Sequence, residues 1–474
     1  MRGCLFFLFF LVGFGALGQD TLPNVFTIEE MYFHVLHFHP VAKQADLLSE
    51  RAKQELRIRR GELDPNVMAR YYKKTLEGKN YYTLINNTLQ IPTWYGPEFR
   101  VMYERNSGVN VNGENITPPQ GLTNLAVVVP VGQGMIIDER RSAIRQAQIF
   151  GSIAEADKIK IINKLLYDAS KAYWHWMFNY QRINFTTNAF ELAQQRFVAV
   201  RERVLQGDLA PIDSIEAYVE VQNREQMLAT ATIEYRNSAI WLSNYLWQED
   251  VVPVQLSDQA VPSFKGLEIT SLTDQELNEL INIAQASHPE VMKNKFKMQQ
   301  LQIERRLAVD KLRPKFTFTY NLLSPGVGIE PNDFTPEHRN NNSKFGVSFY
   351  YPLFLRTERG KLQMAKIKIK ENDLEARSLQ REVENSVRAI YNEYNNLKNQ
   401  VMIQERMVEN YQRLVRGEYE RFDAGESSLF LINSREMTLV NSRVKLAELQ
   451  SKLAQTKAQL YWASGNIYNI DLVK

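Results

Sequence analysis

The sequence contains the same order of segments twice. His39-Pro40 opens a charged, helix-favouring stretch that ends at Pro65, and His288-Pro289 opens another that ends at Pro314. In both copies the two prolines are separated by the same length of chain. Self-similarity over this length predicts two structural repeats within one architecture, and it constrains the fold more than any single motif does.

Each copy also contains a charged, helix-favouring run without an internal proline. The first run extends from Glu139 to Gly207, and the second, of nearly the same length, extends from Glu358 to Gly425. At 1.5 Å per residue, a continuous helix of this length is about 100 Å long. Helices of globular proteins typically have about 8 to 20 residues. The runs therefore predict a long helical bundle and not an ordinary globular core.

A second helix is predicted beyond each glycine, because apolar residues recur there at steps of seven. They are Val221, Leu228, Tyr235 and Leu242 in the first copy and Leu439, Leu446, Leu453 and Leu460 in the second. A single offset relates the two sets, and the same offset relates Gly207 to Gly425. Sustained seven-residue spacing predicts coiled-coil packing against a neighbouring helix.

Between its shorter and longer helices, each copy has two segments in which apolar and polar residues alternate. The apolar positions are Phe316, Phe318, Tyr320, Leu322, Phe345, Val347, Phe349 and Tyr351 in the second copy, and more weakly Phe99, Val101, Tyr103, Leu125, Val127, Val129 and Val131 in the first. Periodicity alone fits both a strand pair on a soluble core and the wall of a membrane β-barrel. The Asn-, Gly- and Pro-rich loops at 106–121 and 324–343 favour the barrel. Four strands per chain cannot close a barrel, so several copies would have to share one.

The first copy is longer than the second between its strand prolines. The stretch from Pro65 to Pro130 is more than half as long again as the stretch from Pro314 to Pro352. The additional sequence, around Asn80 to Gly96, is rich in aromatic residues. It fits an aromatic belt at a membrane interface and equally well a segment packed against the outside of the barrel.

The predicted organisation follows from these patterns. Residues 1–18 have one early cation and a short apolar run, which is typical of a cleaved secretory signal peptide. The first repeat covers 19–248, with strands at about 65–131 and long helices at about 138–248. Residues 249–273 form a linker. The second repeat covers 274–474, with strands at about 314–352 and long helices at about 357–464.

Composition narrows the possible functions. The 57 basic and 54 acidic side chains give a net charge of +3, so nucleic acid is not an expected partner. The single cysteine, Cys4, lies in the predicted signal peptide, which removes disulfides and thiolate sites from the mature chain. His34 and His37 have helical spacing but no nearby carboxylate completes a metal site. No nucleophile elbow, phosphate loop or dinucleotide fingerprint is present, so we expect neither an enzyme nor a cofactor.

The segment from Arg421 to Ser428, with the seven-residue series that follows it, resembles the periplasmic tip of TolC-like outer-membrane efflux proteins. The segment from Arg203 to Leu209 is similar but weaker. The resemblance implies a homotrimer with a twelve-stranded barrel among the lipids of the outer membrane and an α-helical tunnel that crosses the periplasm. It also implies a tip that docks a periplasmic adaptor joined to an inner-membrane pump. The implied docking residues are Gly207, Asp208, Arg421, Phe422, Gly425 and Glu426.

In that family, acidic side chains six and nine residues after the tip glycine can line the closed entrance. The first copy has Asp213 and Glu216 at these places, whereas the second has Leu431 and Ser434. Near a helix start, such acids also fit a plain role in balancing the helix dipole. The expected function is export of small molecules or proteins through an outer-membrane channel. The alternative is a periplasmic coiled-coil scaffold or adaptor that never enters the membrane.

Overall fold

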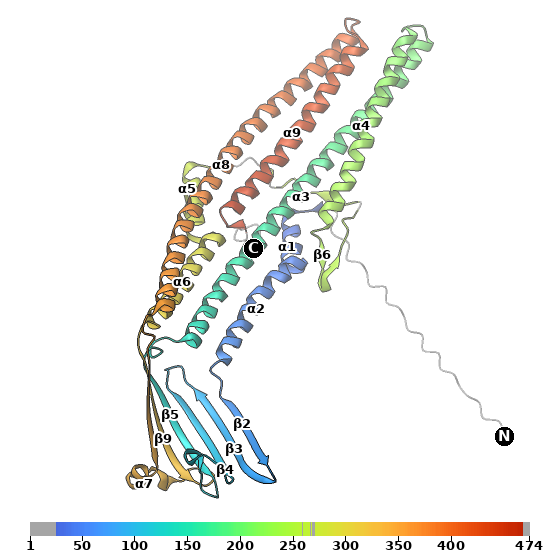
Figure 1. The fold of residues 1–474 in the computed structure, drawn as a ribbon. Helices are drawn as coiled ribbons and strands as arrows, with labels where there is room; N and C mark the ends of the chain where they lie inside the picture. Colours follow the sequence, from blue (N-terminus) through green and yellow to red (C-terminus); the bar gives the residue numbers. More distant parts are fainter. Residues whose placement is uncertain (1–24, 258, 266, 268–270, 468–474) are drawn as a thin grey trace, which may run out of the picture.

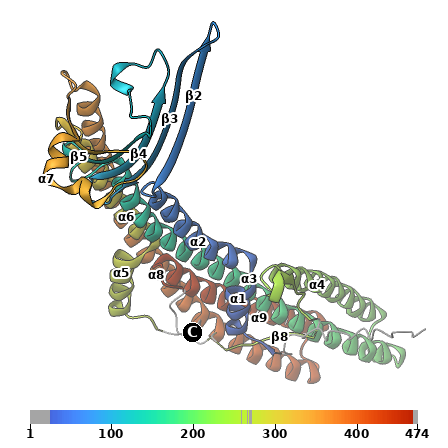
Figure 2. The same ribbon diagram turned by 90° about the horizontal axis from the view of Figure 1, so that it is seen from below.

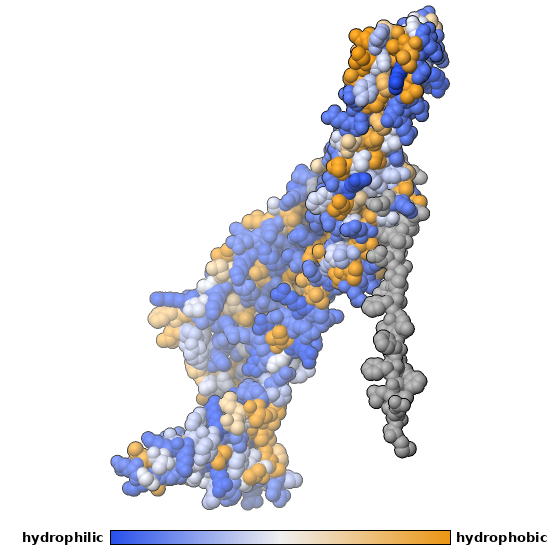
Figure 3. Space-filling model, turned by 90° about the vertical axis from the view of Figure 1, so that its right-hand side faces the viewer, coloured by the Kyte–Doolittle hydropathy of each residue, from blue (hydrophilic) through white to orange (hydrophobic). Residues whose placement is uncertain are grey.

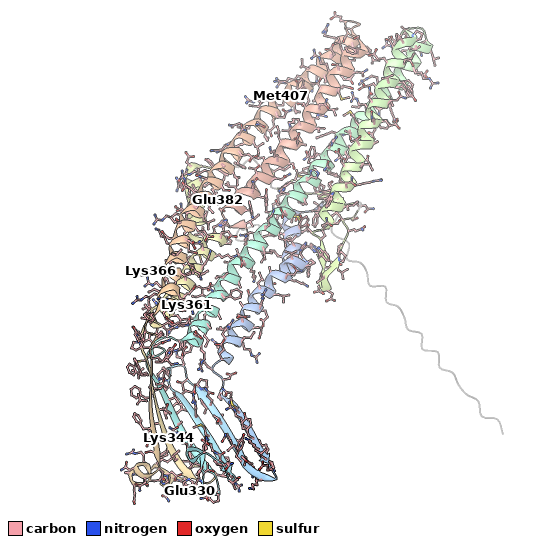
Figure 4. The ribbon with its side chains drawn as sticks, viewed as in Figure 1. Glu330, Lys344, Lys361, Lys366, Glu382 and Met407 are labelled. Atoms are coloured by element: carbon pink, nitrogen blue, oxygen red, sulfur yellow. The ribbon has the colours of Figure 1, made fainter. Side chains whose placement is uncertain are left out.

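The computed structural model describes residues 25–257, 259–265, 267 and 271–467, so the predicted signal peptide lies outside the described residues. The molecule is elongated, with a β-sheet at one end and two long helical hairpins that reach the other (Figure 1). Glu330, between the last two strands of the sheet, and Met407, on a long helix, lie toward these opposite ends (Figure 4).

Each repeat contributes helices, strands of the sheet and one long hairpin. The first comprises α1 (Ile28–Phe38), α2 (Pro40–Gly61), β2 (Asn66–Leu76), β3 (Lys79–Pro92), β4 (Glu98–Ser107), β5 (Leu122–Gly132), α3 (Glu139–Leu205) and α4 (Pro211–Ser243). The second comprises α5 (Asp274–Ser287), α6 (Pro289–Asp310), β9 (Lys315–Pro325), β10 (Ser343–Tyr350), α8 (Arg356–Asp423) and α9 (Leu429–Ala463). The mainly helical fold with a β portion confirms the predicted fold class.

Short elements fill the connections. They are β1 (Val25–Phe26), η1 (Gly113–Asn115), β6 (Trp247–Gln248), η2 (Glu249–Val251), β7 (Val252–Pro253), β8 (Val261–Pro262), η3 (Pro331–Phe334) and α7 (Pro336–Asn341). The strand β8, in the connection between the repeats, pairs in parallel with β1. The end of the first repeat is thereby attached beside its beginning.

The expectation of four strands per chain is wrong. The sheet has six antiparallel strands among the described residues, in the order β10-β9-β5-β4-β3-β2. The aromatic segment around 80–96 is mainly the strand β3, which forms a hairpin with β2. Lys73-Lys74 and Asn86-Asn87 interrupt the alternation in these two strands, and this is why the pattern did not reveal them. The two strands of the second copy, β9 and β10, lie at one side of the sheet.

The largest core lies halfway along the molecule, where α1, α3 and the ends of α4 and α9 meet. Tyr173, Trp176 and Met177 of α3 are fully buried there against Phe26 and Met31. The Tyr173 hydroxyl lies 3.0 Å from the carbonyl oxygen of Phe26 and 3.2 Å from that of Ser263, and its single proton is shared between these two acceptors. This core therefore joins both ends of the first repeat to the connection that follows it.

The long helices pack in pairs, α3 with α4 and α8 with α9 (Figure 1). Tyr394, Leu397 and Val401 of α8 form a buried cluster with Leu449 and Leu453 of α9. The last of these belongs to the seven-residue series identified in the sequence, and it therefore lies in a helix-to-helix seam. No helix in the described part of the chain is both long and apolar enough to cross a membrane.

Two histidines cap helices at equivalent places in the two repeats. His39 Nδ1 accepts the backbone N–H of Val41 at 3.1 Å at the start of α2, and His288 Nδ1 accepts that of Glu290 at 3.3 Å at the start of α6. Burial lowers the pKa of both imidazoles below the ordinary value of 6.5. The neutral form that can accept a hydrogen bond is thereby favoured at each helix start.

Candidate functional site

The predicted tip turns end the two hairpins with the same backbone geometry. Gly207 has φ +85° and donates its N–H to Val204 O at 3.1 Å, while Asp208 N–H reaches back to Arg203 O at 2.9 Å. Gly425, with φ +75°, does the same to Phe422 O at 3.0 Å. This is the Schellman pattern of a helix end, in which glycine takes the left-handed conformation without the steric cost of a side chain.

The second turn also has the counterpart of the hydrogen bond from Asp208 to Arg203 in the first turn. Glu426 N–H reaches Arg421 O at 2.8 Å, and the Arg421 guanidinium donates to Glu426 O at 3.2 Å. Ser427 donates its hydroxyl proton to Glu418 at 2.6 Å, which holds the pKa of that carboxyl below its ordinary value. Of the predicted docking residues, Gly207, Asp208, Arg421, Gly425 and Glu426 are exposed. They are available to a partner protein.

Phe422 differs from the other predicted docking residues because it is half-buried. It packs against an apolar cluster that joins both hairpins just behind the turns. The cluster comprises Phe197, Val200 and Val204 of α3, Leu209 of the first turn, Ala217 of α4, and Phe422 and Leu429 of the second hairpin. The structure therefore brings the two predicted tips together at one end of the molecule.

A buried charged network lies behind this cluster and connects all four long helices. Arg196 of α3 donates to Asn433 of α9 and to the Tyr419 hydroxyl of α8, both at 2.6 Å. It also contacts Glu436 of α9, which accepts the Tyr419 hydroxyl proton as well. Burial, and then the contact with Glu436, raises the pKa of Tyr419 to about 12. The phenol is therefore protonated and acts as a donor at physiological pH.

The helix α4 adds a second guanidinium to the same carboxylate. Arg224 is 1% exposed, and its Nε donates to Glu220 at 2.6 Å. Its Nη2 lies 3.7 Å from Glu436 Oε2. Two arginines from the first hairpin therefore converge on one glutamate of the second. Removal of one partner from such a buried pair is strongly destabilising, because the other charge remains buried without compensation.

Sequence reasoning did not identify this network. One signal was available, since Arg224 belongs to a seven-residue series with Ala231 and Ser238, and all three are buried. A charged residue inside a buried series is costly unless it is paired, so the position predicts a partner. The identity of that partner could not be read from the sequence, because Glu436 lies in the other repeat and on another hairpin.

The two predicted entrance acids lie on the first turn and a half of α4. Asp213 accepts the backbone N–H of Ala210 through Oδ2 at 3.2 Å, so it helps to close the start of the helix. Both Asp213 and Glu216 are half-buried. At the equivalent places of the second hairpin, Leu431 and Ser434 are exposed.

A sequence comparison matches residues 280–466 to the family of outer membrane efflux proteins. The matched region covers most of the second repeat. No protein with a curated description matches the chain. The match confirms the resemblance inferred from the sequence and agrees with the predicted location in the outer membrane.

The fold is similar to that of solved outer-membrane channels over most of the chain. The CmeC channel of Campylobacter jejuni is 13% identical, with a TM-score of 0.63 over 93% of this chain and 86% of that one. The VceC protein of Vibrio cholerae is 14% identical, with a TM-score of 0.63 over 93% of this chain and 96% of that one. The open MtrE channel of Neisseria gonorrhoeae is 14% identical, with a TM-score of 0.63 over 93% and 89%. Over 93% of its length the chain thus has the fold of outer-membrane channels, and its second repeat has the sequence pattern of outer membrane efflux proteins.

Proposed function

We propose that this protein is the subunit of a homotrimeric outer-membrane channel that exports small molecules or proteins from the periplasmic side. A periplasmic adaptor and an inner-membrane pump would supply the cargo. The observation that carries the proposal is the division of the molecule into a two-faced sheet at one end and, at the other, two helical hairpins whose longer helices have 67 and 68 residues. The match to outer membrane efflux proteins supports it.

The surface of α4 supports assembly with further copies. Besides its buried series at Arg224, Ala231 and Ser238, α4 has exposed apolar residues at Ile212, Val219, Ile233 and Ile240, with exposed fractions of 47 to 70% and Gln226 at the intervening place of the seven-residue frame. Hydrophobic residues also gather at the tip end of the helices and along the sheet (Figure 3). A stripe at seven-residue spacing is the surface that another long helix covers. The exposed apolar residues Ile403, Met407 and Leu414 of α8 offer a matching surface on a neighbouring copy.

The turns at the helix ends are the proposed docking site for the adaptor. Asp208, Arg421 and Glu426 present exposed charges on backbone turns of the same geometry. Because both turns belong to one subunit and lie together, a trimer would offer six similar contacts. In this arrangement Phe422 supports the turn from behind, since it packs into the cluster that joins the hairpins.

Asp213 and Glu216 are the proposed lining of the entrance. In a trimer they would form two rings of three carboxylates, which attract cations and disfavour anions. The hydrogen bond from Ala210 to Asp213 gives that residue a local role as well. The two roles are compatible, because one carboxylate oxygen accepts the backbone proton and the other remains available.

Fractionation and mass measurement test the proposal directly. The mature protein should be found in the outer-membrane fraction, require detergent for extraction, and have the mass of three chains in detergent. The alternative, a periplasmic scaffold, predicts recovery in the soluble periplasmic fraction without detergent. A stable, correctly folded monomer in detergent would overturn the trimeric channel.

A further inference from the structure

The β2–β3 hairpin extends the sheet beyond the four strands expected for the chain (Figure 2). The outermost strands, β2 and β10, each have one edge that no other strand of the described part of the chain pairs with. Every residue of both strands is exposed. In a bilayer, unpaired backbone groups on such edges have no water to bond, so in a membrane the edges must be paired by another chain.

The hairpin continues the two faces of the sheet in register. One row of directly opposed residues runs Val67, Leu89, Val101, Leu125 and Leu322 and ends at Ser343 of β10. The neighbouring row on the other face runs Asn66, Gln90, Arg100, Ala126, Asn321 and Lys344, across all six. The first row is apolar except for Ser343, and the second is polar except for Ala126. A strand in a membrane wall needs such a division between a lipid-facing side and an inward-facing side.

The strand directions at the two edges are also complementary. The strand β2 leaves the end of α2 and runs away from the helices, whereas β10 runs toward the start of α8 (Figure 1). The β2 edge of one copy therefore meets the β10 edge of another in the antiparallel sense that holds throughout the sheet. With 11 and 14 residues, β2 and β3 are long enough to cross a bilayer, which takes about 9 to 11 residues per tilted strand.

We propose that the β2–β3 hairpin is part of the membrane wall and that the β2 edge of each subunit pairs with the β10 edge of a second copy of this chain. The inference rests on the proposed trimeric channel and changes its size. Six strands from each of three copies make a wall of eighteen. Because barrel diameter grows roughly linearly with strand number, the pore through the membrane is about 1.5 times as wide as that of a twelve-stranded barrel.

Disulfide cross-linking tests the pairing, since the chain has no cysteine other than Cys4 in the predicted signal peptide. Val347 of β10 is on the apolar face of the sheet, opposite Phe318. Val347→Cys is combined in turn with Val67→Cys, Ala69→Cys and Tyr71→Cys, which lie on the same face of β2. We expect at least one pair to convert most of the oxidised protein into covalent dimers and trimers. Cysteines can be bridged only when their Cβ atoms are about 3.5 to 4.5 Å apart.

A matched control and a folding control accompany these variants. Tyr72→Cys with Val347→Cys places one thiol on the opposite face of the same strand, so it should give no cross-link. Leu89→Cys with Val101→Cys should form a disulfide within one chain, because these residues face each other in β3 and β4. That intrachain bond shows that the hairpin remains in the sheet of the assembled protein.

A competing set of variants defines the result that would overturn the inference. If the hairpin leaves the wall, β4 becomes the edge, and Val347→Cys should cross-link between chains with Val101→Cys or Phe99→Cys. That result would leave a twelve-stranded trimer and the proposed function intact. If neither set of pairs links two chains, β10 meets neither edge, and both the inference and the shared wall of the proposed channel fail.

Discussion

Because Glu436 contacts both Arg196 and Arg224, the stability of the contact between the hairpins should depend on its charge. We consider Glu436→Gln, which keeps the size of the side chain and one oxygen acceptor but removes the charge. The side chains of Arg224, Glu436 and Arg196 are 2, 9 and 13% exposed. After the exchange, Arg224 retains Glu220, while Arg196 has only the neutral Asn433 and Tyr419 among its observed partners.

The expected cost follows from this loss of charge compensation. Breaking a buried ion pair by removing one partner costs about 3 to 5 kcal/mol. Because the glutamine still accepts a hydrogen bond and Glu220 stays in place, we expect the lower limit, about 3 kcal/mol. At about 1.4 kcal/mol per factor of ten, amide protons at the tip should exchange roughly 100 times faster. The faster amide exchange should occur in residues 190–210 and 415–440 and should not extend to the core around Tyr173.

Hydrogen exchange measured by mass spectrometry on the detergent-solubilised trimer is the assay. Glu393→Gln is the matched control, because Glu393 pairs with Lys452 between α8 and α9 but both side chains are about half exposed. Exposed pairs contribute at most about 1 kcal/mol, so this variant should change exchange less than tenfold. Equal effects of the two substitutions at the tip, or an equal increase throughout the molecule, would refute the reasoning.

Three further variants test other parts of the structure. The pKa of both His39 and His288 is lowered in the folded chain, so the stability that these caps contribute is present above the unfolded pKa of 6.5 and is lost as the pH falls below it. Since His288→Asn can cap without titrating, amide exchange at the start of α6 in this variant should be independent of pH between about 7.5 and 5.5 once the intrinsic pH dependence of exchange is subtracted. Continued pH dependence would count against the cap. Gly425→Val should cost about 1 to 2 kcal/mol locally, because φ is +75° although no atom lies within 4 Å of the added Cβ; export should fall while trimer mass is unchanged, and normal export would argue against a docking tip. Asp213→Asn with Glu216→Gln should reduce cation preference and block by multivalent cations in planar bilayers, whereas unchanged currents would show that these side chains do not face the pore.

The long helices were predictable because their signal is local and repeated. The run that begins at Glu139 has no proline before the turn at Gly207, and α3 occupies it from Glu139 to Leu205. In the seven-residue series of α9, Leu446 and Leu453 similarly mark positions that pack on α8. Positive φ at Gly207 and Gly425 follows from the same reasoning, since only glycine takes this conformation at little cost.

The features that were missed depend on residues far apart or on weak alternation. The strands β2 and β3 contain adjacent lysines and adjacent asparagines, so their two faces become visible only when Val67 is aligned with Leu89 and Val101. The pairing of Arg196 with Glu436 requires the relative position of two hairpins. A single sequence contains the spacing along one helix but not the rotation of one helix against another.

The added hairpin enters and leaves the sheet at the same end. The strand β2 follows α2, and β3 returns the chain to the helical side before β4 begins. A protein built in this way can gain or lose strands in twos during evolution without reversing the direction of any downstream segment. The diameter of the end formed by the sheet and the diameter of the end formed by the helices can therefore be selected separately. Duplication or deletion of a hairpin is sufficient to change the diameter of the sheet end while the diameter of the helical end stays constant.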